Sequence, residues 1–144
     1  MLPGGGEEEA AVASMFPQSH MDLLADAARA FAVLTTVMPD GSPQATVLWF
    51  DMDGDHLRVN TARGRVKERN MSARPKVALV ILDPRVPGRY MQIRGTVIGS
   101  SEAGAREHIS HLAYKYTGET QFDVPPGQVR VTFTIRPDSV SADG

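Results

Sequence analysis

The sequence of 144 residues has no cysteine, few aromatic residues and no long apolar run. Without cysteine there can be no disulfide, no zinc ribbon and no thiol nucleophile. No stretch approaches the ~18 consecutive apolar residues of a membrane-spanning helix, and no basic segment followed by an apolar run resembles a signal peptide. With only 6% aromatic residues, the chain also lacks the interleaved stacking rings of nucleic-acid binders. These absences predict a cytoplasmic protein that binds neither membranes nor nucleic acid.

The length fits one globular domain, at about 100–200 residues per domain. Residues 1–18 contain three consecutive glycines, three consecutive glutamates and two prolines. Such a segment buries too little apolar surface to offset its ordering entropy. We therefore expect a disordered tail at 1–18 and a single folded domain at 19–144.

The net charge of −2 hides a strong asymmetry along the chain. Residues 1–55 carry nine acids and a single base, Arg29. Between Arg58 and Lys76, seven bases stand against one acid, Glu68. This concentration of positive charge on a mildly acidic molecule is the first indication of a binding site for an anion.

Hydrophobic periodicity predicts a mainly β (α+β) chain. In 129–135 apolar and polar residues alternate, as in a half-buried strand, and Asp53-Gly54 is a typical hairpin turn. Helices are expected to begin at Ser19, Arg65 and Ser101. Strands are expected at 31–37, 44–52, 57–61, 77–82, 90–98 and 129–135. Six short, mostly antiparallel strands with few helices indicate a small barrel or sandwich rather than a parallel sheet.

One junction combines features that suit a phosphate. A strand ends near Thr61, Gly64 allows close backbone approach, and a basic helix opens near Arg65. Helix N-termini present unpaired N–H groups to anions, and Arg65 and Lys67 add positive charge. The alternative is that 63–74 forms an ordinary solvated basic helix face.

Other notable residues have structural interpretations. Trp49, the only tryptophan, shares one face of the predicted strand with Val47, and a lone strand tryptophan is more often part of a core or a dimer interface than of a ligand wall. His108 and His111 lie three residues apart on a predicted helix without a third ligand at suitable spacing. We therefore expect surface histidines and no metal site.

No nucleophile motif, phosphate-binding Walker loop or acid–base pair is evident. No catalytic residue can therefore be assigned from the sequence. A phosphate site without such groups is typical of proteins in which a cofactor supplies the chemistry.

Several motifs together resemble a known superfamily. They are Pro39–Gln44, Trp49–Asp51, Asn60–Asn70, Asp83-Pro84, Arg89–Gly95 and Lys115–Glu119. In these motifs the chain is similar to the flavin-binding split β-barrels around pyridoxamine 5'-phosphate oxidase, and more narrowly to their branch of oxidoreductases dependent on the deazaflavin coenzyme F-420. The resemblance implies a six-stranded antiparallel split β-barrel that forms a homodimer with two cofactor clefts at the subunit interface.

The resemblance also implies roles for particular residues. Arg65 and Lys67 would bind the cofactor phosphate, the 46–49 strand would lie along the ring, and residues 90–92 of the partner chain would close the cleft. Many relatives have proline at or beside Leu48, where this chain has none. The candidate cofactor-binding residues are Thr46, Val47, Trp49, Asn60, Thr61, Ala62, Arg63, Gly64, Arg65, Lys67, Tyr90, Met91 and Gln92.

The function implied is transfer of hydride from reduced coenzyme F-420 to an unsaturated small-molecule substrate. The cofactor carries the hydride, and solvent or Tyr90 would supply a proton. Three alternatives remain: an oxidase or reductase that uses flavin mononucleotide (FMN), a non-enzymatic cofactor carrier, and a haem-degradation protein on the same barrel.

Overall fold

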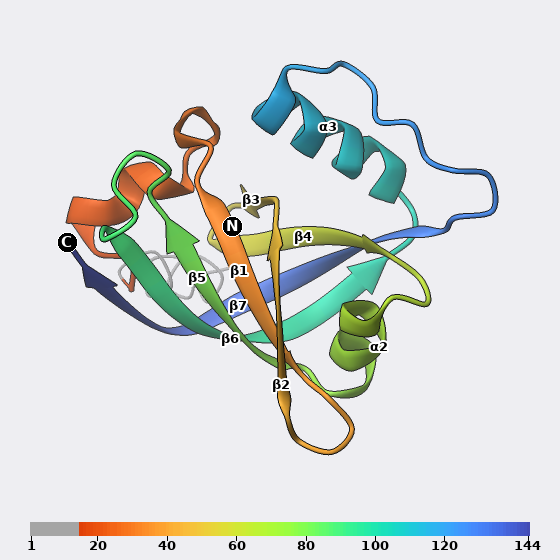
Figure 1. Ribbon diagram of the computed structural model, residues 1–144, viewed down its shortest axis with the longest axis horizontal. Coiled ribbons are helices and arrows are strands. Elements are labelled where there is room, and N and C mark those ends of the chain that lie inside the picture. Colours follow the sequence, from red (N-terminus) through yellow and green to blue (C-terminus); the bar gives the residue numbers. More distant parts are fainter. Residues whose placement is uncertain (1–14) are drawn as a thin grey trace, which may run out of the picture.

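A computed structural model describes residues 15–144, which form a single curled antiparallel sheet with short helices around it (Figure 1). The strands are β1 (Phe31–Val37), β2 (Pro43–Leu48), β3 (Phe50–Asp53), β4 (His56–Ala62), β5 (Lys76–Leu82), β6 (Tyr90–Ser101) and β7 (Arg130–Asp143). The helices are the 3-10 helices η1 (Gln18–Leu24) and η2 (Asp26–Ala28) and the α-helices α2 (Val66–Ala73) and α3 (Ala105–Thr117).

The sheet has seven strands in the order β2-β1-β5-β6-β7-β4-β3, so the expected count of six is wrong by one. The predicted strand 44–52 is interrupted at Trp49, and its two halves lie at opposite edges of the sheet. The chain therefore crosses the opening of the split barrel at Trp49. The sequence alone could not show this break, because 47–50 is a continuous apolar run of residues that all suit a strand.

The end of α3 accounts for the position of the break. The Lys115 ammonium donates a hydrogen bond to the Phe50 carbonyl at 2.6 Å. The Tyr116 hydroxyl accepts one from the Phe50 amide at 3.3 Å and donates one to the Ala30 carbonyl at 2.6 Å. These contacts tie the first residue of β3 to α3 and to the start of β1. Trp49 is left between two anchored strands.

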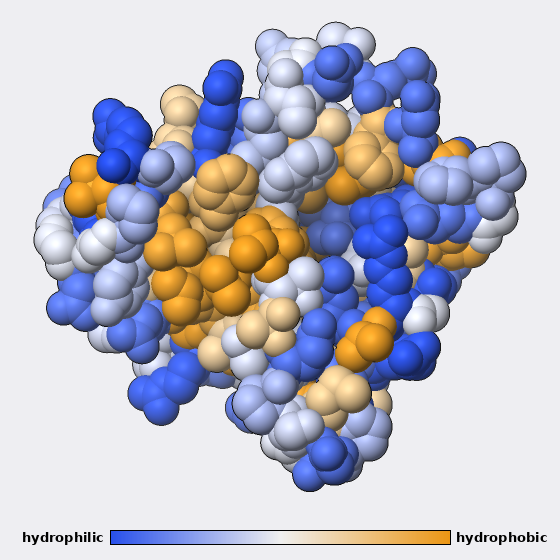
Figure 2. All heavy atoms as spheres, viewed as in Figure 1, coloured by the Kyte–Doolittle hydropathy of each residue, from blue (hydrophilic) through white to orange (hydrophobic). Residues whose placement is uncertain are grey.

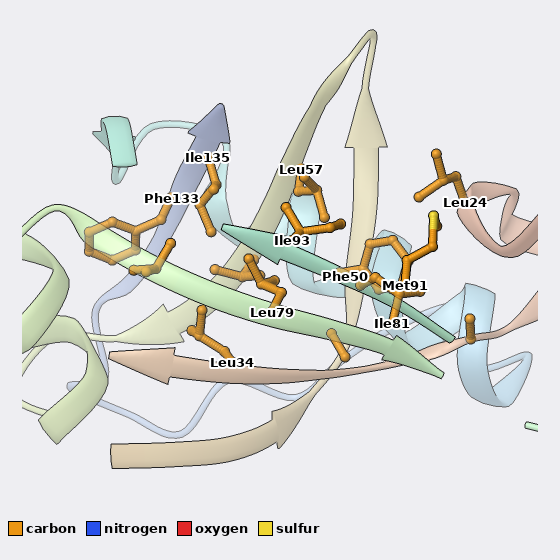
Figure 3. Packing of buried hydrophobic residues seen from close by; sticks show 14 of the residues in the cluster. Leu24, Leu34, Phe50, Leu57, Leu79, Ile81, Met91, Ile93, Phe133 and Ile135 are labelled. Carbon is orange, nitrogen blue, oxygen red and sulfur yellow. The ribbon is translucent and has the colours of Figure 1, made fainter. Parts of the chain in front are cut away.

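The hydrophobic core fills the inside of the curled sheet (Figure 3). Alternate residues of each strand point inward, among them Leu34, Leu79, Ile93 and Phe133, all 1% exposed. At Gly95, beside a register shift, β6 approaches β7 so closely that an added Cβ would lie 2.8 Å from the Arg136 carbonyl oxygen. This approach bends the sheet into a half-barrel, which confirms the predicted split-barrel class.

The remaining elements differ from the predictions mainly at their ends. The expected N-terminal helix consists of two 3-10 helices, η1 and η2. β6 continues to Ser101, so α3 begins after Gly104 rather than at the predicted Ser101. Most of the predicted tail, 1–14, lies outside the described residues, but Phe16 is buried with 5% of its surface exposed. Its large apolar side chain extends the folded part ahead of Ser19.

Among residues 15–144, no helix has the length and apolar character needed to cross a bilayer.

Candidate functional site

Trp49 is one end of a stack of three aromatic rings, with Tyr116 in the middle. Its ring lies 5.4 Å from that of Tyr116 at an interplanar angle of 7°, and Tyr116 in turn stacks on Phe31 at 5.8 Å. Burial raises the pKa of the Tyr116 hydroxyl, so it remains a neutral hydrogen-bonding group. The stack holds the half-buried Trp49 indole in one orientation.

One side of Trp49 borders a cavity of about 260 Å³, here called the cation cavity. Its apolar wall comes from β2 and α3, and its aromatic residues are Trp49 and Phe122. Its polar residues are Asn60, Arg65, Lys67 and Arg130. The start of α2 and the start of β7, distant in sequence, thus place three cations around one cavity.

The three cations of this cavity have no carboxylate partner within the described part of the chain. Burial lowers the pKa of Lys67, and the nearby Arg65 and Arg130 lower it further. Burial, with Arg65 beside it, lowers the pKa of Arg130 to about 10. Partly buried like charges repel one another, and an anion between them would remove this cost.

Arg130 was not among the residues predicted for the site. It is 6% exposed, and its Nε donates a hydrogen bond to Asn60 Oδ1 at 2.9 Å. Its guanidinium also lies 5.5 Å from the centre of the Phe122 ring. In the sequence, Arg130 is only a charged residue at the start of an otherwise regular strand. Its burial and its lack of a carboxylate partner are visible only in the three-dimensional structure.

The loop before α2 is arranged differently from the predicted phosphate cradle. The Gly64 amide donates its hydrogen bond to Glu68 Oε1 at 2.8 Å, and this bond is the main reason why the pKa of Glu68 is lowered. Arg63 pairs with Glu102 at 2.9 Å. A carboxylate of the chain itself therefore takes the Gly64 amide that was predicted for a phosphate, and the free positive charge is on side chains.

Two other residues of this loop lie inside the molecule. The Thr61 side chain is fully buried, and its Oγ1 has no hydrogen-bond partner among residues 15–144. Ala62 is 2% exposed at the end of β4. Five of the predicted residues therefore line the cation cavity, namely Val47, Trp49, Asn60, Arg65 and Lys67. Residues 61–64 are not part of its lining.

The remaining predicted residues occupy two faces of the sheet. Thr46 lies opposite Leu34 on the inner face. Tyr90 and Gln92 lie on the outer face at the start of β6, outside the cavity lining. Met91 is fully buried in the core between them, because successive strand residues point to opposite faces. The role of residues 90–92 in closing the cleft of a partner chain stays a prediction, with the Met91 side chain facing the core of its own chain.

A second, larger cavity of about 870 Å³ adjoins the other side of the aromatic stack. Trp49, Tyr116 and Phe31 form one wall, and Asp22 and Asp83 lie on another. Both carboxylates are paired with Arg89, at 2.6 and 3.0 Å. Trp49 is part of the lining of both cavities.

The two histidines of α3 have different environments. His111 is an exposed histidine as expected, with 47% of its side chain accessible. His108 is buried, with only 2% accessible, and its Nε2 lies 2.9 Å from Asp51 Oδ1. The prediction of a surface His108 is wrong, because its partner is 57 residues away in sequence. Within the described chain no three His, Asp, Glu or Cys residues form a metal-binding group.

Comparisons with known proteins agree on one group. The sequence profile of the pyridoxamine 5'-phosphate oxidase family matches residues 17–142. A solved F420 reductase is similar at 33% identity, with 88% of this chain and 98% of that chain covered and a TM-score of 0.77. No curated protein sequence matches significantly.

Two further structures have the same fold at lower identity. A Listeria innocua protein of the pyridoxamine 5'-phosphate oxidase type is 21% identical, with 86% and 94% of the two chains covered and a TM-score of 0.63. General Stress Protein 26 of Bacillus anthracis is 18% identical, with the same coverage and a TM-score of 0.62.

Proposed function

The chain belongs to the pyridoxamine 5'-phosphate oxidase family, and we propose that it binds the deazaflavin coenzyme F-420 and passes hydride from its reduced form to an unsaturated small molecule. Family and fold support an oxidoreductase of the flavin- or deazaflavin-binding kind. The choice of the deazaflavin rests on the 33% identity to an F420 reductase.

The observation that carries the proposal is the cluster of uncompensated cations beside an apolar and aromatic wall. This donor set fits a cofactor that joins a phosphate to a flat ring. Arg65, Lys67 and Arg130 hold the phosphate by charge-assisted hydrogen bonds, while Trp49 and the apolar residues of β2 flank the ring. The bound deazaflavin supplies the hydride, and the protein supplies binding, orientation and exclusion of water.

The larger cavity is proposed to receive the substrate. It shares Trp49 with the lining of the cation cavity, and an aromatic wall suits a planar unsaturated molecule. Arg89 pairs with both Asp22 and Asp83, and Arg85 lies 3.7 Å from Asp83, so two guanidinium groups balance the two carboxylates of this cavity.

The outer face of the sheet supports the homodimer proposal. Residues paired across neighbouring strands share a face of the sheet. One row of such residues crosses β2, β1, β5 and β6 and consists of Val47, Val33, Val80 and Gln92, in that order. The next row contains Phe31, Leu82 and Tyr90. Figure 2 shows apolar surface over β1 and β5. A second copy packed on this face would bring its Tyr90 and Gln92 toward the cleft.

Substitution of Val33 or Val80 by lysine tests this interface. Each change places an unpaired ammonium on the apolar face, where burial against a partner costs several kcal/mol. We expect both variants to sediment as monomers under conditions in which the wild-type protein is a dimer. Ile98→Lys is the matched control, because Ile98 is an equally apolar residue that is 47% exposed outside these rows. A dimer that tolerates both valine changes would contradict the interface.

The cofactor proposal is tested by titrating the purified protein with coenzyme F-420 and with FMN. Trp49 is the only tryptophan and lines the cation cavity, so its fluorescence reports binding directly. We expect the deazaflavin to bind more tightly. Tight binding of FMN alone would favour the FMN-dependent alternative.

Turnover separates an enzyme from a carrier. The reduced deazaflavin is mixed with the protein and a panel of enones, quinones and tetrapyrroles, and its oxidation is followed by absorbance. Oxidation that depends on both protein and substrate is expected. Tight binding without turnover of any compound would favour the carrier alternative.

A further inference from the structure

A chain of buried polar side chains runs beneath the cation cavity and ends at Arg130. Asp51 Oδ1 lies 2.9 Å from His108 Nε2. His108 Nδ1 lies 3.1 Å from Asn60 Nδ2, and Asn60 Oδ1 accepts a hydrogen bond from Arg130 Nε at 2.9 Å. The four residues come from β3, α3, β4 and β7, so this chain exists only in the folded protein. We call it the buried polar chain.

The orientation of the Asn60 amide is fixed by its contacts. Its Nδ2 donates to the Ala105 carbonyl at 2.9 Å, and its Oδ1 faces the Arg130 guanidinium, which has only donors. The Nδ2 group therefore also donates toward His108 Nδ1. A hydrogen on Nδ1 would point at the Asn60 amide hydrogens, so Nδ1 is the acceptor of this contact; the Thr132 hydroxyl, which can donate or accept, lies 3.1 Å from the same ring nitrogen.

This assignment fixes the proton of His108. With Nδ1 accepting, a neutral imidazole carries its hydrogen on Nε2 and donates it to Asp51. Asp51 is itself held by Arg58, through bonds of 3.1 and 2.7 Å. Burial favours the neutral acid, but the hydrogen bonds from His108 and Arg58 outweigh it, and the pKa of Asp51 is lowered. A charged carboxylate thus selects the tautomer on which the Asn60 contact depends.

The last link presents Arg130 to the cavity. Its Nε is engaged by Asn60 and its Nη1 by Gln128 at 3.1 Å, while Nη2 has no hydrogen-bond partner in the part of the chain that the structure describes. The guanidinium is therefore held through Nε and Nη1, and its Nη2 group is free to donate hydrogen bonds to an anion.

We propose that Asp51 and His108 are positioning residues for the anion site: they orient the Asn60 amide, and the amide aims the Arg130 guanidinium at a bound phosphate. This inference rests on the proposed function, since it assigns an anion to the cation cavity. It adds two residues that line neither the cation cavity nor the larger cavity.

Two substitutions of His108 separate positioning from folding. Glutamine can reach the position of Nε2 and keep the contact to Asp51, but it has no acceptor at the position of Nδ1. Asparagine places its Oδ1 near the position of Nδ1 and retains an acceptor for Asn60, although it does not reach Asp51. His108→Gln therefore loses only the contact to Asn60, and His108→Asn loses only the contact to Asp51.

The measured quantity is the phosphate contribution to affinity, defined as the ratio of the riboflavin dissociation constant to that of FMN. Both ligands carry the same ring, and only FMN has the phosphate. For the deazaflavin, the 5'-monophosphate of the deazaflavin nucleoside is compared with the nucleoside itself in the same way. Loss of fold stability weakens both ligands of a pair, so it leaves this ratio unchanged.

We expect His108→Gln to lower the ratio by about 10-fold, the worth of one well-oriented hydrogen bond, and His108→Asn to restore most of it. Equal ratios in wild-type protein and His108→Gln would overturn the positioning role while leaving the proposed function intact. A wild-type ratio of one for both ligand pairs would overturn the anion site itself, and the positioning role with it.

Discussion

Replacement of Lys67 by alanine is expected to weaken binding of coenzyme F-420 or FMN by about 10- to 150-fold. The change removes a charge-assisted hydrogen bond to phosphate, worth roughly 1.5–3 kcal/mol. Lys67 has no carboxylate partner among the described residues, and its lowered pKa reflects burial and two neighbouring arginines. The free protein therefore loses a repulsion, and we expect its free energy of unfolding to stay the same or to rise.

Titration followed by Trp49 fluorescence measures the affinity, and urea denaturation measures the stability. His111→Ala is the control, because the His111 side chain is 47% exposed and does not line the cation cavity. Equal losses of affinity in the two variants would place the phosphate elsewhere. A large loss of stability in Lys67→Ala would mean that the ammonium has a structural counter-ion.

The second large effect is expected at Asp51. Its side chain is 3% exposed and is paired with Arg58 and the buried His108. Asp51→Asn removes a buried carboxylate that accepts hydrogen bonds from both Arg58 and His108, so we expect it to lower the free energy of unfolding by about 3 kcal/mol at neutral pH. Asp53→Asn, two residues along the same strand at an exposed position, should change it little.

The effect of Asp51→Asn on the free energy of unfolding should depend on pH. The pKa of Asp51 is lower in the folded protein than its usual value of 3.8. Its contribution to stability is therefore complete well above pH 4 and is lost as the pH falls through the lowered folded pKa. The difference in unfolding free energy between wild-type protein and Asp51→Asn should shrink in that acidic range. A difference that stays constant down to pH 2 would show that the Asp51 charge does not contribute.

The strands were largely predictable because each follows a local rule. β7 alternates apolar and polar residues at its start, and its alternate residues Val131, Phe133 and Ile135 are buried. The turn at Asp53-Gly54 separates β3 from β4 as expected. Local patterns do not record which strand edges meet, and the interruption at Trp49 depends on Lys115 and Tyr116, more than 60 residues later.

The candidate site was predictable in part for the same reason. Arg65 and Lys67 are close in sequence, so their concentration of charge is visible without a structure. The occupation of the Gly64 amide by Glu68 is also a local contact, but a basic segment with a glycine suggested an external anion instead. Arg130 joins the site from β7, and nothing near it in sequence marks it as a partner of Lys67.

The sequence by itself determined the strand content, the absence of thiol chemistry and the concentration of positive charge after β4, because composition and period are local properties. Only the tertiary structure decided that this charge lies beside Trp49, that Arg130 completes it, and that His108 is buried. Each of these depends on side chains from distant strands meeting in space. Their pairing is fixed by how the whole core packs, and core packing is not a property of any one segment.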